Sequence, residues 1–515
     1  MRAALAGVVA LAALGASLLP AGRAPAQEAN QGAAPSGPNV VLLMTDDQRY
    51  DDMGPLPQTR RLIGKAGVTF TRSYVSYPVC CPSRATFFTG QYAHNNRVLC
   101  LYKDCGGGGH GGYTALKQKE YLPVWLERAD YTTAHMGKFL NGYGKDREPP
   151  DVPRGWTEWY GLIDHSTYRM WGYDVFENGR RRTYGNVRRE IPRYYQTDVL
   201  ADKAVDFVRR HARDDAPFFL SVAFLAPHHE SGHTQHITGK LVRSAPRHRG
   251  RYANAALHKL PNYNEQNLSD KPWFIGRWNR KLTPRREAAI VKRMRERQES
   301  LLAVDDAVED VIDELRRTGQ LDNTYVIFTS DHGYMQGEHR IPQGKMMPYD
   351  PSTQVPLLIR GPGIPSGRRT KALVGNVDMA PSIVQVARAR AGLAMDGRSF
   401  LPFARNPRLR SLRPLLHETT GQGARGKTNT REGGAKGQQP RVPAWRAVRT
   451  TQWLYVDYQG GQRELYNLSR DPYQLRSVAS DPNNRQRLRT LRRILGDLSR
   501  CKGASCGKLA DASVR

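Results

Sequence analysis

Two pairs of potential metal ligands follow apolar runs that are far apart in the chain. The dipeptide Asp46-Asp47 comes directly after PNVVLLMT, and the dipeptide Asp331-His332 comes directly after TYVIFTS. A lone acidic pair at such a place is typical of a helix cap or a turn. Two pairs at the ends of two predicted strands indicate a shared site, because open α/β sheets bind ligands at that edge. The carboxylates favour Ca²⁺ or Mg²⁺, and the histidine leaves Mn²⁺ or Zn²⁺ open.

A second unusual stretch is Cys80-Cys81-Pro82-Ser83-Arg84. Two adjacent cysteines alone are typical of a buried or disulfide-bonded pair. The proline, hydroxyl residue and arginine that follow make the stretch far more specific than a cysteine pair. The remaining cysteines form two local pairs, Cys100/Cys105 and Cys501/Cys506, which could each close a short disulfide loop. Zinc binding is the alternative for these four, although their spacing favours it little.

The elements that would position these residues alternate between strands and helices. Further strands are predicted at 131–136, 217–224 and 355–360, and helices at 197–211 and 299–318. Continuous apolar runs are typical of strands that are buried on both faces of a parallel sheet. The alternation predicts an α/β fold with a large, mostly parallel sheet sandwiched by helices.

The N-terminus has the pattern of a secretory signal peptide over residues 1–26. Arg2 precedes an apolar run, and the small residues Ala24-Pro25-Ala26 resemble a cleavage site. A polar leader is expected at 27–37. Since no later stretch is long and apolar enough to span a membrane, we expect a secreted or periplasmic protein.

Composition predicts how the rest of the chain is divided. A catalytic α/β domain is expected at 38–419, with an insertion at about 229–285 that could form a substrate rim or a loop without a specific role. A flexible basic linker at 420–443 follows. A smaller C-terminal subdomain with an antiparallel sheet and a last helix is expected at 444–500, before a tail at 501–515.

The chain is strongly basic. Its 515 residues include 78 Lys and Arg against 48 Asp and Glu, a formal net charge of +30. Such a charge favours polyanions, which include nucleic acids, anionic lipids and sulfated or phosphorylated sugars, although a solvated basic surface would have the same composition. No familiar nucleic-acid-binding motif is present, so we expect no nucleic-acid partner.

From about Pro38 to Ser480 the chain resembles the sulfatase family of the alkaline phosphatase-like superfamily. Seven motifs follow one another in the family's order: PNVVLLMTDDQ, CCPSRATFFTG, YTTAHMGK, APH, TSDHG, the lysine of IPQGKMMPYD, and VPLLIRGPGI. The motifs are most similar to the N-acetylglucosamine-6-sulfatase and extracellular heparan sulfatase branch.

The resemblance implies that Cys80 is oxidised to formylglycine by a formylglycine-generating enzyme. The hydrated aldehyde, a gem-diol, would then attack the sulfur of a sulfate ester. The implied metal is Ca²⁺, with Mg²⁺ or Mn²⁺ as alternatives. Its implied ligands are Asp46, Asp47, modified Cys80, Asp331 and His332.

The resemblance also assigns the remaining catalytic residues. Arg84 would hold the formylglycine oxygens, and Lys138 and Lys345 would bind the sulfate group. His228 would face the ester oxygen, although His229 beside it leaves a one-residue ambiguity.

One position departs from the family's pattern. Many arylsulfatases have a histidine where this chain has Leu140. Asn141 or His165 could take over that histidine's part in the reaction.

The sequence therefore predicts an exported sulfuric ester hydrolase that acts on sulfated sugars such as N-acetylglucosamine-6-sulfate. Three alternatives remain on the sequence alone. They are an arylsulfatase for small esters, a phosphatase, phosphodiesterase or phosphonate hydrolase on the same scaffold, and a non-catalytic binder of sulfated polysaccharide.

Overall fold

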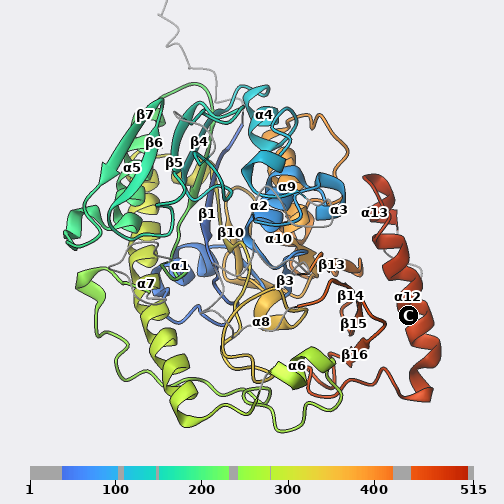
Figure 1. The fold of residues 1–515 in the computed structure, drawn as a ribbon. Coiled ribbons are helices and arrows are strands. Elements are labelled where there is room, and N and C mark those ends of the chain that lie inside the picture. The colour runs from blue at the N-terminus through green and yellow to red at the C-terminus, as the bar shows by residue number, and fades with distance from the viewer. Residues whose placement is uncertain are drawn as a thin grey trace, which may run out of the picture. The chain divides into compact units, whose positions relative to one another are not determined.

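A ten-stranded sheet runs through the centre of the computed structural model (Figure 1). The structure describes residues 37–101, 110–145, 150–230, 242–278, 280–421 and 442–508. In spatial order the strands are β11 (Arg368–Thr370), β2 (Val68–Phe70), β10 (Leu357–Arg360), β9 (Thr324–Ser330), β1 (Asn39–Thr45), β8 (Phe218–Ala223), β4 (Thr132–Gly137), β5 (Glu158–Leu162), β6 (Tyr173–Glu177) and β7 (Arg180–Tyr184).

The middle of this sheet is parallel. Strand β1 pairs in parallel with β8 and β9, and β4 pairs in parallel with β8 and β5. Antiparallel pairs occur toward the edges, where β10 meets β9 and β2, and where β6 meets β5 and β7. The predicted large, mostly parallel sheet is therefore confirmed.

Helices cover both faces of the sheet, as Figure 1 shows. The helices α2 (Cys80–Thr89), α4 (Leu122–Glu127) and α9 (Met379–Ala387) lie on one face, and α5 (Gln196–His211) and α7 (Pro284–Arg317) on the other. Alternate β1 side chains enter the two cores: Leu42 packs with the first group, and Val41 and Leu43 with the second. This is why the strand is apolar throughout its length.

A separate antiparallel sheet forms near the C-terminus. Its strands are β13 (Leu415–Thr419), β14 (Trp445–Arg449), β15 (Trp453–Tyr458) and β16 (Arg463–Asn467), and α12 (Arg485–Leu498) packs on one face. Strands β14 to β16 and helix α12 lie within residues 444–500, for which an antiparallel sheet and a last helix were predicted. The first strand, β13, lies within the residues assigned from the sequence to the catalytic domain. The domain boundaries themselves stay a prediction.

The remaining elements are short. Besides several 3₁₀ turns, they are α1 (Pro57–Thr59), α3 (Ala93–Asn96), α6 (Trp273–Trp278), α8 (Asp350–Thr353), α10 (Leu401–Arg405), α13 (Ala504–Lys508), β3 (Ser73–Tyr74), β12 (Val374–Gly375) and a π-helical turn at Arg60–Lys65. Within the predicted insertion, the described residues form one short 3₁₀ turn, Pro246–His248, α6 and the start of α7.

Helix α7 begins well before the predicted start at Glu299. Its first half is highly polar, and only a few side chains there, such as Ile290 and Met294, are buried. Thr283 caps the helix through Oγ1, which accepts from the backbone N–H of Arg286 at 3.4 Å. Pro284 follows at the first helical position, a common N-terminal signal.

Several sequence predictions concern residues outside those that the structure describes. They include the signal peptide, the leader to residue 36, most of the basic linker, and Cys105 of the Cys100/Cys105 pair. Cys501 and Cys506, for which the sequence left a disulfide or zinc binding open, form a disulfide. Among the described residues, no helix combines the length and apolar character needed to cross a membrane.

The packing of α12 predicts a stability effect. Leu498 is fully buried between this helix and the C-terminal sheet. Leu498→Ala should lower the free energy of unfolding by about 2–5 kcal/mol, because it leaves a cavity. Arg493→Ala removes an exposed side chain from the same helix and serves as the control. Equal midpoints of thermal unfolding for the two variants would contradict this packing.

Candidate functional site

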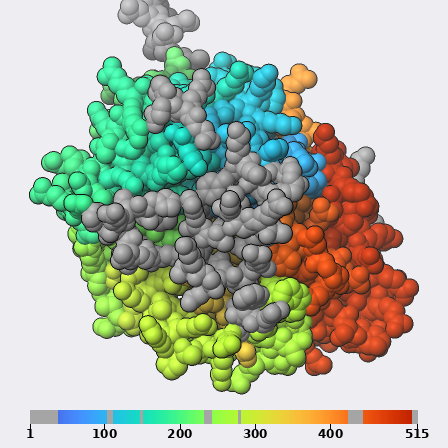
Figure 2. Space-filling view, in the orientation of Figure 1, coloured from blue at the N-terminus to red at the C-terminus, as the bar shows by residue number. Residues whose placement is uncertain are grey.

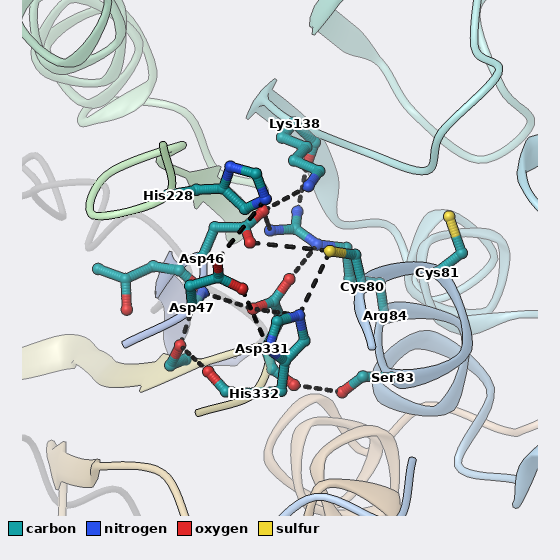
Figure 3. Close-up of polar contacts among 12 residues, drawn as sticks. Asp46, Asp47, Cys80, Cys81, Ser83, Arg84, Lys138, His228, Asp331 and His332 are labelled. Atoms are coloured by element: carbon teal, nitrogen blue, oxygen red, sulfur yellow. Dashed lines mark hydrogen bonds and ion pairs between the residues drawn. The ribbon is translucent and has the colours of Figure 1, made fainter. Parts of the chain in front are cut away.

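Four neighbouring strands deliver predicted site residues to one edge of the central sheet. Asp46 and Asp47 follow β1, and Asp331 and His332 follow β9. Because Thr45 pairs with Ser330 in a parallel register, the residues after them emerge side by side. Strands β4 and β8, next in order, lead to Lys138 and His228, and Figure 3 shows these side chains pointing toward one another.

Helix α2 brings two further residues into the same place. Cys80 is its first residue, and Arg84 lies one turn later on the same side of the helix. Arg84 Nε donates to Asp331 Oδ2 at 2.8 Å, and Nη2 donates to Asp46 Oδ2 at 3.1 Å. Its Nη1 donates to the carbonyl oxygen of Lys138 at 2.5 Å. One guanidinium therefore joins the ends of β1, β9 and β4.

Ser83 fixes the start of α2 against β9. Its hydroxyl donates to the carbonyl oxygen of Asp331 at 2.5 Å, and the side-chain amide of Asn376 donates to the same hydroxyl at 3.0 Å. These contacts hold the first turn of the helix against the metal-ligand candidates.

Four side chains form a cluster that could hold a metal ion. The potential ligand atoms of Asp46, Cys80, Asp331 and His332 lie within 4.8 Å of one another, and all four residues are buried. The Cys80 Sγ atom is 3.3 Å from His332 Nε2 and 3.8 Å from Asp46 Oδ1. Carboxylates and one imidazole suit a divalent cation.

Asp47 extends this cluster. Its backbone adopts a left-handed conformation, with φ of 67°, and its N–H donates to Asp331 Oδ1 at 3.2 Å. Its Oδ1 lies 3.3 Å from His332 Nδ1, and its Oδ2 lies 3.6 Å from His228 Nε2. Among the described residues, neither that Oδ2 nor that Nε2 has a hydrogen-bond partner, although both are buried. An unsatisfied buried oxygen in a carboxylate cluster fits a cation site.

Two lysines complete the site. Lys138 Nζ lies 2.5 Å from Asp46 Oδ2. Lys345 Nζ lies 3.0 Å from Asp47 Oδ1, 3.2 Å from Cys80 Sγ and 3.4 Å from His332 Nε2. All nine residues predicted for catalysis and metal binding are thus brought together, while their individual roles stay a prediction.

The electrostatics of the site follow from this crowding. Burial alone would raise the pKa of Asp46, but Lys138, His228 and Arg84 hold it well below its ordinary value. Burial raises the pKa of the Cys80 thiol, and the Asp46 carboxylate raises it further. The carboxylate is therefore ionised, whereas the unmodified thiol is a poor nucleophile.

The two cysteines are not bonded to each other. Neither forms a disulfide, both are buried, and the Cys81 thiol donates to Asn141 Oδ1 at 3.1 Å. Asn141 therefore turns toward Cys81, while Leu140 is buried and His165 is exposed. Asn141 contacts Cys81 and Tyr168, and the parts suggested for Asn141 and His165 stay predictions.

Sequence reasoning missed Tyr168. Its ring centroid lies 4.5 Å from Lys138 Nζ and 4.9 Å from the ring of His228. Its hydroxyl accepts from the side-chain amide of Asn141 at 2.7 Å. Tyr168 lies in the loop after β5, so no periodicity or motif signals its place beside the site.

Arg297 was also missed. It is a buried arginine in the polar half of α7, and its Nη2 donates to the carbonyl oxygen of Asp47 at 2.6 Å. Its Nη1 donates to the carbonyl oxygen of Pro227 at 3.2 Å. Arg297 therefore joins the loop after β1 to the loop that carries His228.

Comparison with known proteins agrees with this arrangement. The Sulfatase family model matches residues 38–389. The chain belongs to the sulfatase family. It is therefore a sulfuric ester hydrolase, which confirms the predicted family and class of enzyme.

Individual relatives differ in their names. Human N-acetylglucosamine-6-sulfatase is 33% identical over 500 residues, which cover 91% of this chain and 86% of that protein. An arylsulfatase of Volvox carteri is 33% identical over 543 residues, which cover 97% of this chain and 78% of that protein.

Solved structures share the fold. One structure, of a protein in complex with its substrate D-glucosamine-2-N,6-O-disulfate, superposes with a TM-score of 0.69. The sequence identity is 20%, and the match covers 92% of this sulfatase and 98% of the other chain. At this identity the similarity establishes the fold alone.

The contacts of Tyr168 predict a positioning effect on Lys138. Tyr168→Leu should lower kcat/KM for 4-nitrophenyl sulfate roughly tenfold to thirtyfold, because a desolvated cation–π contact is lost. Tyr168→Phe keeps the aromatic ring, so its kcat/KM should fall less. Both are measured well below their unfolding midpoints, and equal kcat/KM for the wild type and the leucine variant would rule out this role.

Proposed function

We propose that this sulfatase hydrolyses sulfate esters by means of a formylglycine formed from Cys80 and a divalent cation. The cation would be held by Asp46, Asp47, Asp331 and His332, with the modified side chain as a further ligand. The observation that carries the proposal is the position of Cys80, whose Sγ lies within 3.8 Å of atoms from Asp46, His332 and Lys345. The Sγ atom stands where the modified side chain would carry oxygen.

The proposed reaction needs two groups that the unmodified chain does not contain, the aldehyde and the cation. When present, the hydrated aldehyde supplies the attacking hydroxyl, and the cation supplies positive charge beside it. The residues around Cys80 fit both, because buried carboxylates offer oxygen ligands and Arg84 presents a fixed guanidinium. Maturation would require a formylglycine-generating enzyme as a partner.

The chain's own cations would bind the substrate. A sulfate monoester carries one negative charge, and more charge develops on its oxygens as the ester bond breaks. The Lys138 ammonium group forms an ion pair with Asp46, and the Lys345 ammonium group forms one with Asp47. Cations fixed in advance in a buried site stabilise such developing charge more than water does.

His228 is placed to move a proton. Its Nδ1 lies 2.6 Å from the carbonyl oxygen of His229, so Nδ1 carries a hydrogen and Nε2 faces the site. Burial lowers the pKa of His228, and the Asp47 carboxylate, whose Oδ2 lies 3.6 Å from that Nε2, offsets part of this effect. We infer that His228 Nε2 donates the proton to the leaving alcohol. A ring nitrogen of His229 also lies within 4.8 Å of an Asp47 oxygen, so the choice of His228 over its neighbour stays a prediction.

The preferred substrate is a 6-O-sulfated glucosamine unit of a sulfated glycan. The 33% identity to human N-acetylglucosamine-6-sulfatase and the net charge of +30 support it. A broad arylsulfatase is the second candidate, favoured by equal identity to the Volvox enzyme. Parallel assays of a 6-sulfated glucosamine and 4-nitrophenyl sulfate distinguish the two through the ratio of kcat/KM.

Export is part of the proposal. The signal-like pattern at residues 1–26 and the Cys501–Cys506 disulfide support a secreted or periplasmic location. N-terminal sequencing of the protein recovered outside the cytoplasm tests it, with cleavage expected after Ala26.

Replacing the modified residue tests the nucleophile. Cys80→Ala should abolish turnover of 4-nitrophenyl sulfate and leave the far-ultraviolet circular dichroism spectrum unchanged, because the fold does not need the thiol. Cys81→Ala is the matched control and should retain turnover. Near-wild-type activity of Cys80→Ala would overturn the proposed chemistry.

Metal removal tests the cation. Dialysis against a chelator should lower kcat/KM roughly a hundredfold or more, since the cation's charge stabilisation is worth several kcal/mol. Adding back Ca²⁺, Mg²⁺ or Mn²⁺ separately identifies the ion that restores activity. Asp331→Asn should show weaker metal binding by mass spectrometry of bound elements. Full activity in protein shown to be metal-free would contradict the proposed site.

A further inference from the structure

A cavity lies between the C-terminal sheet, α12 and α3. It has a volume of about 740 Å³ and is lined by the ends of β13, β14 and β15, by the second half of α12 and by residues around α3. Figure 2 shows the C-terminal residues, coloured orange to red, at the surface beside the blue N-terminal region to which α3 belongs. A cavity of this volume is large enough for a small-molecule or sugar ligand.

The lining is rich in guanidinium groups. It includes Arg97, Arg446, Arg492 and Arg500, contributed by three separate parts of the chain. The first three are exposed, and among the described residues none of them forms an ion pair. Arg500 lies 3.4 Å from Asp497.

The two acidic residues in the lining are already engaged. Glu418 accepts from the backbone N–H of His94 and lies 3.1 Å from its ring Nδ1. Asp457 lies 3.6 Å from Arg463. Arg446 is paired in register with both Glu418 and Asp457, yet its guanidinium makes no ion pair with either. The cavity therefore presents an excess of uncompensated positive charge.

We propose that this cavity binds a sulfated or carboxylated sugar unit other than the one being hydrolysed. Guanidinium groups bind sulfate and carboxylate through charge-assisted hydrogen bonds. Trp445 and Tyr458, both buried, form part of the cavity's wall next to the arginines. The inference relies on the proposed function only for the choice of a glycan as the ligand.

Contacts connect the cavity to the catalytic site. Trp445 Nε1 donates to the carbonyl oxygen of Met346 at 3.0 Å, and Met346 directly follows Lys345. The N–H of Met346 donates to the carbonyl oxygen of Pro78, two residues before Cys80, at 3.1 Å. A polymer bound in the cavity would therefore be held near the nucleophile, which raises its effective concentration there.

The test removes the charge without touching the catalytic residues. The triple variant R97Q/R446Q/R492Q is compared with R390Q/R408Q/R410Q, which removes the same charge from exposed arginines outside the cavity. Binding of a heparin octasaccharide is measured by calorimetry in the full-length Cys80→Ala background, so that the ligand is not consumed. Turnover of 4-nitrophenyl sulfate is measured with the same triple variants in protein that retains Cys80.

The cavity triple should weaken octasaccharide binding about tenfold to a hundredfold, from three charge-assisted contacts. It should also reduce the slope of log Kd against log salt by about 2 to 3. Its kcat/KM for 4-nitrophenyl sulfate should stay within about twofold of the wild type. Failure of turnover in the wild type would count against the proposed function rather than the cavity.

A second variant fills the cavity and leaves its charge unchanged. A Cβ atom at Gly496, on α12, would meet only the guanidinium of Arg500, at 3.6 Å. A Cβ atom is therefore sterically accommodated at this position, and leucine favours the helix over glycine. Gly496→Leu should weaken octasaccharide binding while the unfolding midpoint stays the same or rises.

Two results would overturn the inference. If the cavity triple and the control triple lost the same amount of octasaccharide affinity, binding would depend on the overall charge of the protein and not on the cavity. A double-stranded DNA 16-mer that binds as tightly as the octasaccharide, with the same loss in the cavity triple, would make the site a general polyanion site.

Discussion

Three buried carboxylates in one small volume are the constraint on which the rest of the structure depends. Asp46, Asp47 and Asp331 have no exposed surface. Removing an ionised carboxylate from water costs several kcal/mol unless nearby cations compensate it. Arg84 and Lys138 provide compensation from α2 and the end of β4, and Lys345 provides it from a loop beyond β9. The carboxylates are therefore stable only when the fold has assembled completely.

The same cations serve stability and chemistry. In the absence of substrate they neutralise the carboxylates. In the proposed reaction Lys138 and Lys345 would bind the sulfate group, and Arg84 would hold the formylglycine oxygens. Arg84 bridges Asp46 and Asp331, so it also sets how closely two potential cation ligands approach. This dual use explains why the site draws on every central strand of the parallel sheet rather than on one loop.

Much of this arrangement could be predicted from the sequence, because its signals are local. Continuous apolar runs predicted β1 and β9, and the Asp-Asp and Asp-His pairs directly after these runs were the metal-ligand candidates. The polar first half of α7 carried no such signal, since its side chains face solvent along most of their length. Tyr168 and Arg297 reach the site only through tertiary packing, which no spacing in the sequence records. Strand β13 was missed because its pairing partner, β14, follows a long polar segment.

The most direct test of the account is the chemical state of Cys80. Mass spectrometry of the tryptic peptide Ser73–Arg84, from protein produced in its own host, measures it. The account predicts a peptide in which the Cys80 sulfur is replaced by a carbonyl oxygen that reacts with a hydrazide probe. An unmodified Cys80 in active protein, from a host shown to modify other sulfatases, would contradict the proposed nucleophile.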